Sequence, residues 1–268
     1  MKTGVLFFIL LFFLTSCGEE AVDWKLEDRA PDTIVVEAIV TSDRHHFRVK
    51  LSQPFYKSDE SPMAVTGATV SIRRGQETYL LEETTGSPGL YVNPVYTDNP
   101  IGATYYLEVI AEGKTYRAKA VMPPVNVFDH IGFNRVPDTD SMMIGQVPKQ
   151  FNEFEQAMYE ITIDWSHLSS TAPTRAKLYY YTFNTVDVSQ IFAPEKEKVR
   201  FPVGSYVIVR KHSLSPEYAE YLRALVAETQ WQGGIFEETR DNLPTNISNG
   251  GLGFFSACAV LTDTLVAE

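Results

Sequence analysis

The chain has 268 residues, of which 44% are hydrophobic, and it carries 23 basic against 34 acidic residues, a net charge of -11. A basic stripe is the expected footprint of a phosphate-binding surface, and the nearest approach to one is the isolated pair Arg73-Arg74. These features argue against a nucleic-acid partner and against docking on an anionic membrane surface, while the length and apolar content favour two modest domains.

The first predicted element is a signal peptide over residues 1–17. Lys2 supplies a basic start, and the apolar run from Val5 to Leu14 is shorter than the roughly 20 residues needed to cross a bilayer. The run closes with Leu14-Thr15-Ser16-Cys17, which resembles the lipobox of bacterial lipoproteins. That resemblance implies cleavage before Cys17 and lipidation of its sulfur, so that lipid chains would anchor the protein to a membrane. The alternative is an ordinary signal peptide with a cysteine near its cleavage site by chance.

Residues 18–32 are acidic and polar, and we expect them to form a tether between the lipid and the first domain. The Glu19-Glu20 pair resembles the acidic export signal of Bacteroidota lipoproteins. It implies a place in the outer membrane, lipid-anchored and facing the cell exterior. The alternative interpretation of Glu19 and Glu20 is a solvated linker.

Residues 33–122 alternate between apolar and polar side chains, as expected for strands, and no helical stripe interrupts them. Their number and spacing predict a β-sandwich domain of immunoglobulin-like or transthyretin-like type. The predicted strands are Thr33–Thr41, Phe47–Leu51, Ala68–Ile72, Glu77–Glu82, Gly89–Asn93, Thr104–Ala111 and Thr115–Val121.

Consecutive prolines, Pro123-Pro124, favour an extended connection, and we place a domain boundary there. Residues 125–268 are predicted to form a second, mainly β domain with one inserted helix over about 215–230. Ser215 is the expected N-cap and is followed by Pro216 at the first helical position. The predicted strands are Val127–Arg135, Met158–Trp165, Ala176–Val186, Val203–Val209 and Gly253–Leu261.

Several of these features occur in an order that resembles a known family. The lipobox, the Ile34-Val35-Val36-Glu37 opening strand, Gly89-Leu90-Tyr91, the proline pair, the helix after Ser215 and the segment from Asn246 to Phe255 follow one another along the whole chain. They look like a Bacteroidota lipoprotein family defined only as a domain of unknown function, number 4249. Its members are typically encoded beside TonB-dependent outer-membrane receptors, which implies a partnership with such a receptor in nutrient uptake. The family carries no catalytic motif.

The residues themselves indicate a protein without an enzymatic function. The compact motifs of serine hydrolases, zinc peptidases and phosphate-binding loops are absent from the sequence. Adjacent strand residues point to opposite faces, so His45 and His46 are not expected to share a metal. Cys258 lies in an apolar run and is predicted to be a buried small hydrophobe. We therefore expect no catalytic residues, no metal and no cofactor.

Aromatic side chains are the predicted binding or interface groups, because they bury large rigid areas and keep a polar tip. The candidates are Tyr179, Tyr181, Tyr218, Tyr221 and Trp231, and packing in the core is the competing interpretation for each of them. Gly250, Gly251 and Gly253 indicate either a bulged strand entry or a ligand loop. Together these features favour a cell-surface lipoprotein that assists, or captures ligand for, a TonB-dependent receptor. The alternative is a surface adhesin or structural spacer with no small ligand.

Overall fold

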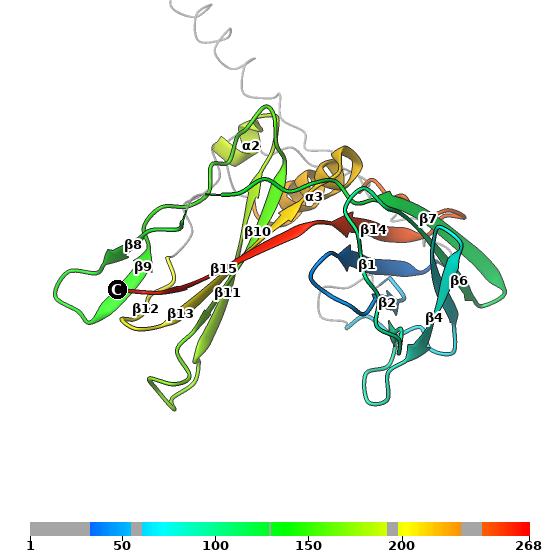
Figure 1. The fold of residues 1–268 in the computed structure, drawn as a ribbon, viewed down its shortest axis with the longest axis horizontal. Coiled ribbons are helices and arrows are strands. Elements are labelled where there is room, and N and C mark those ends of the chain that lie inside the picture. The colour runs from blue at the N-terminus through cyan, green and yellow to red at the C-terminus, as the bar shows by residue number, and fades with distance from the viewer. Residues whose placement is uncertain (1–32, 55–60, 129, 192–197, 232–242) are drawn as a thin grey trace, which may run out of the picture. The chain divides into compact units, whose positions relative to one another are not determined.

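The computed structural model describes residues 33–54, 61–128, 130–191, 198–231 and 243–268 (Figure 1). The predicted signal peptide, Cys17, Glu19, Glu20 and the tether lie outside these described residues. Within them the fold is mainly β with one main helix, as predicted (Figure 1). None of the described helices has the length and apolar character to cross a membrane.

The largest sheet has eight strands, and it contains all seven strands predicted between residues 33 and 122. An eighth strand comes from the other end of the chain and pairs in parallel with β1, while every other neighbouring pair is antiparallel. In spatial order the strands are β14 (Leu252–Cys258), β1 (Val35–Thr41), β2 (Arg48–Ser52), β5 (Leu90–Val92), β4 (Glu77–Glu83), β3 (Thr69–Arg74), β6 (Thr104–Ala111) and β7 (Lys114–Val121).

Alternation along each strand decides which side chains fill the interior of this sheet. In β6, Tyr105, Leu107 and Val109 are buried, while Tyr106 and Glu108 between them are partly exposed. The inward side chains of the other strands join the same hydrophobic cluster. Burying a large apolar side chain contributes roughly 1.5–3 kcal/mol, so this cluster holds the sheet together.

A short segment before β14 connects the two edge strands of the sheet, β7 and β14. The Asn246 amide nitrogen donates to the carbonyl oxygens of Lys119 (3.2 Å) and Phe255 (2.7 Å), and its oxygen accepts from the Phe255 amide (2.9 Å). Ser248 bonds twice to the backbone of Arg117, at 2.8 and 2.9 Å. These bonds satisfy groups that an open edge would leave unpaired, so the sheet is nearly closed.

The second half of the chain forms two smaller antiparallel sheets. In spatial order, the strands of the four-stranded sheet are β11 (Arg175–Thr182), β10 (Ala157–Asp164), β13 (Tyr206–Ser213) and β15 (Val260–Val266). Those of the three-stranded sheet are β12 (Phe201–Pro202), β9 (Ser141–Ile144) and β8 (Phe133–Arg135). The prediction missed β9, β12 and the short helix α2 (Val188–Ile191). It also extended β8 too far toward its N-terminal side and placed β13 too early, because Lys211 and His212 are polar in sequence yet buried in the structure.

The predicted strand Gly253–Leu261 is two strands that belong to different sheets. β14 ends at Cys258 and β15 begins at Val260, so Ala259 is the only residue between them (Figure 1). Ala259 is buried, and its amide donates to the Ser213 hydroxyl at 2.9 Å. Residues assigned by sequence to the second domain therefore complete the sheet of the first, and Asp32–Glu268 form one compact unit.

The predicted helix is present as α3 (Pro216–Thr229). The Ser215 hydroxyl accepts from the Tyr218 amide at 3.2 Å, Pro216 occupies the first turn and Gln230 is the C-cap. This N-cap satisfies one of the amides that a helix start leaves without an intrahelical partner. Leu222 and Val226 lie on the buried face of α3, which packs against side chains of β10 and β14 in a third hydrophobic cluster.

Candidate functional site

Four of the five candidate aromatics belong to the hydrophobic cluster under α3. Tyr218 and Trp231 are buried there, and Tyr181 and Tyr221 pack against the cluster while remaining partly exposed. Burial raises the pKa of Tyr181 to about 12 and that of Tyr218 well above its usual value. Tyr179 differs from the others, because it is exposed on β11. Most of the candidate aromatics therefore serve packing, and only Tyr218 and Tyr221 also line a concave surface.

That surface is a groove of about 320 Å³ between α3 and the outer face of β1 and β2, called the α3 groove below. One wall consists of Tyr218, Tyr221, Leu222 and Leu225, whose spacing of three and four residues places them on one side of the helix. The other wall contains the alternating outward side chains of the strands, which are Glu37, Ile39, Arg48 and Lys50. The groove exists because the helix packs beside a sheet face.

Three aromatic rings meet at the floor of the α3 groove. The ring centre of Phe254, from β14, lies 5.0 Å from that of Tyr221 and 5.3 Å from that of Tyr218, and the two tyrosine rings are 6.1 Å apart. Burial and the nearby Glu37 carboxylate raise the pKa of the Tyr221 hydroxyl, so it stays neutral at physiological pH. The floor is therefore apolar and uncharged.

The rim of the α3 groove is positively charged. Lys50 and Glu37 form an exposed ion pair at 2.7 Å and offset each other. Arg44 and Arg48 also line the groove and are exposed, and among the described residues neither guanidinium has an ion pair or hydrogen bond. Two guanidinium groups without an ion pair thus lie beside an apolar floor in an acidic protein, although Arg44 helps to lower the pKa of the neighbouring Asp43. The sequence analysis did not single out these two arginines.

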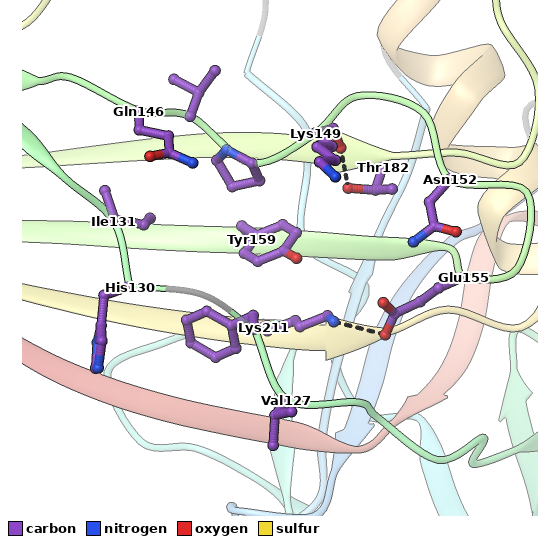
Figure 2. Close-up of a pocket in the computed structure, with 13 residues that line it drawn as sticks. Val127, His130, Ile131, Gln146, Lys149, Asn152, Glu155, Tyr159, Thr182 and Lys211 are labelled. Atoms are coloured by element: carbon purple, nitrogen blue, oxygen red, sulfur yellow. Dashed lines mark hydrogen bonds and ion pairs between the residues drawn. The ribbon is translucent and has the colours of Figure 1, made fainter.

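A second cavity, of about 220 Å³, lies against β10 and β13 (Figure 2). Its notable group is Lys211, whose side chain is only 2% exposed and whose ammonium lies 2.7 Å from Glu155. Lys211 also donates to the Asn126 carbonyl at 3.1 Å and lies 5.7 Å from the centre of the Tyr159 ring. Its charge is compensated within the protein, unlike the charges at the rim of the α3 groove. We call this second site the Lys211 cavity.

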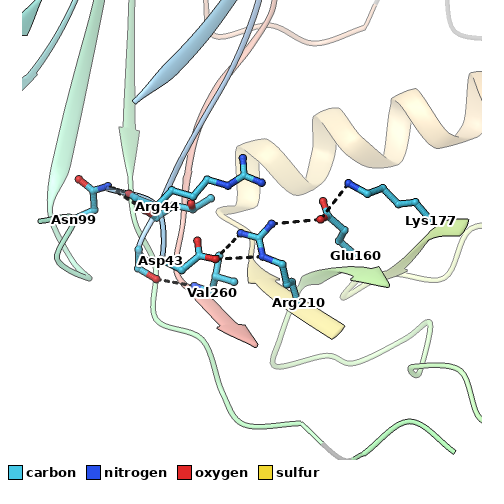
Figure 3. A network of polar contacts seen from close by, with 9 residues as sticks. Asp43, Arg44, Asn99, Glu160, Lys177, Arg210 and Val260 are labelled. Carbon is cyan, nitrogen blue, oxygen red and sulfur yellow. Dashed lines mark hydrogen bonds and ion pairs between the residues drawn. The ribbon is translucent and has the colours of Figure 1, made fainter. Parts of the chain in front are cut away.

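A chain of ion pairs connects the loop after β1 to the four-stranded sheet (Figure 3). Arg210 on β13 lies 2.6 Å from Asp43 and 3.3 Å from Glu160, and Lys177 lies 3.2 Å from the same glutamate. Although burial acts to raise the pKa of Asp43 and Glu160, hydrogen bonds and the nearby cations lower both values. The Arg210 side chain is 12% exposed, so this network is a structural connection and not an open site.

The candidate glycines lie where the chain enters β14, and none of them is among the residues that line the two cavities. Gly253 has a φ of +81°, and a Cβ atom there would lie 2.2 Å from the Val36 carbonyl oxygen. A Cβ at Gly251 would lie 2.5 Å from the Ile247 side chain, and Gly250 has a φ of +73° in open space. The backbone of β14 passes so close to Val36 at Gly253 that a side chain has no room there, while β14 and β1 pair in unbroken register through this residue.

Two of the groups that could support catalysis, Cys258 and His212, are buried, whereas the exposed His130 ring lies 2.7 Å from the Asp263 carboxylate. Cys258 is buried as predicted, and burial raises the pKa of its thiol to about 12, so it stays protonated and unreactive. His212 is also buried, and neither of its ring nitrogens has a hydrogen-bond partner among the described residues. No cluster of three or more potential metal ligands occurs in the part of the chain that the structure describes.

These observations define a mainly β protein in which a groove lies beside α3, the longest helix of the described residues. The chain belongs to the family described as Domain of unknown function (DUF4249), whose sequence profile matches residues 19–264. No curated protein matches the sequence at a significant level.

Proposed function

We propose that this chain is a lipid-anchored outer-membrane protein at the cell surface that captures ligand for, or assists, a TonB-dependent receptor in nutrient uptake. The observation that carries the binding role is the α3 groove, where an apolar aromatic floor lies beside Arg44 and Arg48, neither of which forms an ion pair among the described residues. Ligand sites commonly combine apolar walls with a few well-placed polar groups. The proposed location rests on the Leu14-Thr15-Ser16-Cys17 motif and on Glu19 and Glu20.

The proposed receptor partnership is supported by the resemblance between this chain and lipoproteins encoded beside such receptors. The proposed non-enzymatic role is supported by the buried, protonated state of Cys258. We further propose that the nearly closed eight-stranded sheet is a divergent member of the immunoglobulin-like or transthyretin-like sandwiches. Strand β14, which joins the sheet in parallel, would be the main departure from that plan.

Affinity purification of the native lipoprotein tests the partnership. The chain is tagged after Glu268, which is exposed, and extracted from outer membranes in mild detergent. An unrelated lipoprotein with the same tag is the control, and a Cys17→Ser variant should lose its membrane association. We expect a TonB-dependent receptor to co-purify in near-equal amounts. Recovery of the lipoprotein alone, with surface exposure confirmed, would overturn the partnership and favour the adhesin or spacer role.

A further inference from the structure

We propose that the α3 groove binds a small organic anion, in which a carboxylate or phosphate group is attached to an apolar body. This inference rests on the ligand-capturing role proposed above and names the class of ligand. It follows from the difference between the apolar floor and the positively charged rim of the groove. The floor complements the apolar body of such a molecule, and the rim complements its anionic group.

The floor suits the apolar end of the ligand. Phe254, Tyr218 and Tyr221 form a contiguous aromatic surface, and Leu225 extends it along the helix. Tyr221 and Leu225 are partly exposed, so an aromatic or aliphatic group placed over them would remove apolar area from water. The groove volume of about 320 Å³ is at the lower end of the range for small-molecule sites.

The rim suits the anionic end of the ligand. A guanidinium pairs with carboxylate or phosphate through two parallel hydrogen bonds, which gives both strength and orientation. Arg44 and Arg48 form no ion pair among the described residues, although Arg44 helps to lower the pKa of the neighbouring Asp43, whereas Lys50 is already paired with Glu37. Although the chain as a whole is acidic, the two arginines give this groove a local positive charge that would attract an anion.

The Lys211 cavity lacks this complementarity. Its buried ammonium is neutralised by Glu155 and bonded to a backbone carbonyl, so an entering anion would have to displace existing contacts. The two sites therefore predict different ligand preferences. Of these two sites, the α3 groove is the one that presents cations without an ion pair, among the described residues, next to an apolar surface.

Direct binding measurements test the inference. The full-length lipoprotein is reconstituted in nanodiscs, and binding is measured by calorimetry with 3-phenylpropionate, phenyl phosphate and the neutral 3-phenylpropanamide, with empty nanodiscs as the blank. We expect the better of the two anions to bind at least about tenfold more tightly than the amide. The relative affinities of the two anions decide between a carboxylate and a phosphate as the group recognised.

Three variants locate the binding. Combining Arg44→Gln with Arg48→Gln should weaken binding of the anions at least about tenfold, and Leu225→Gln should weaken it by about threefold or more. Arg200→Gln, at an exposed arginine outside the groove, is the matched control and should bind as the unaltered chain does. Thermal unfolding should be the same for the unaltered chain, the double variant and Arg200→Gln, and somewhat lower in temperature for Leu225→Gln, because Leu225 packs against the cluster under α3.

Equal binding of the amide and the anions would overturn the inference, as would unchanged anion binding in the double variant or failure of both anions to bind. None of these results would affect co-purification with a receptor, so the proposed partnership and the proposed ligand class can fail separately. Loss of co-purification with anion binding retained would leave the ligand class standing.

Discussion

The α3 groove and the Lys211 cavity both contain cations next to aromatic rings, but their charges are handled in opposite ways. In the cavity, Lys211 is buried and paired with Glu155. In the groove, Arg44 and Arg48 are exposed and unpaired among the described side chains. We infer from this difference that a buried charge that stabilises the fold is paired with an opposite charge of the same protein. A charge at a binding surface is left without an ion pair, so that it can bind a ligand. Four predictions test this comparison.

The largest expected effect is at the floor of the groove. Phe254 is 7% exposed and packs against Tyr218 and Tyr221, so Phe254→Ala should leave a cavity and lower the free energy of unfolding by about 3–5 kcal/mol. Urea unfolding of the variant would measure this loss. A change below about 1 kcal/mol would mean that the floor does not support the helix, contrary to its place in the third hydrophobic cluster.

The next effect concerns the buried ion pair. Glu155→Gln should leave the Lys211 ammonium without its counter-charge in a buried site, at a cost of about 3 kcal/mol. Lys211→Met should cost less, because the Glu155 side chain is 20% exposed and can reach water. Urea unfolding of the two variants provides the comparison. Equal losses of unfolding free energy in the two variants would contradict this expectation. They would show that an unpaired Glu155 carboxylate costs as much as an unpaired Lys211 ammonium.

A pH effect is expected from His212, which adjoins Lys211 on β13. Burial lowers its pKa from 6.5 to about 4, and Arg210 acts in the same direction, while Glu160 and Asp43 oppose it. Between pH 6.5 and about 4 the unfolded chain therefore binds more protons than the folded one. The free energy of unfolding should fall as the pH falls through this window, by up to about 3 kcal/mol from this group.

The matched variant His212→Leu isolates that contribution from the carboxylates that titrate in the same range. Urea unfolding at several pH values should give a shallower pH dependence for His212→Leu than for the unaltered chain. Identical slopes would mean that His212 finds a partner for its proton in the folded state.

The smallest effect is expected at the rim of the groove. Because Arg44 and Arg48 are exposed and unpaired among the described residues, replacing both with glutamine should change the free energy of unfolding by less than about 0.5 kcal/mol. Thermal unfolding measures this. A larger loss would show that these arginines stabilise the fold, and the contrast with Lys211 would disappear.

Local patterns in the sequence predicted the strands of residues 33–122 and the helix after Ser215. Alternation and capping are short-range signals, and they are decided within a few residues of chain. The helix wall of the groove could also be anticipated, because Tyr218 and Tyr221 are aromatic and lie one helical turn apart.

The remainder of the site could not be predicted, because it depends on contacts between distant parts of the chain. Phe254 reaches the groove only through the parallel pairing of β14 with β1, in which it lies opposite Glu37. In the sequence, nothing distinguishes Arg44 and Arg48 from other solvent-exposed arginines. Their place at the groove becomes clear only when the position of α3 is known. The short strand β12 forms by pairing with β9, which also pairs with β8, and Lys211 is buried where Glu155 and the Asn126 carbonyl meet its ammonium.

The single-residue junction at Ala259 has a consequence for the order of folding. The strand that completes the first sheet lies more than 200 residues from its partner β1, so that pairing must wait until the residues between them have been synthesised. A truncation just before Leu252 would therefore remove an edge strand from the eight-stranded sheet as well as β15 from the four-stranded one. During synthesis the first sheet stays incomplete until β14 emerges, long after its other seven strands.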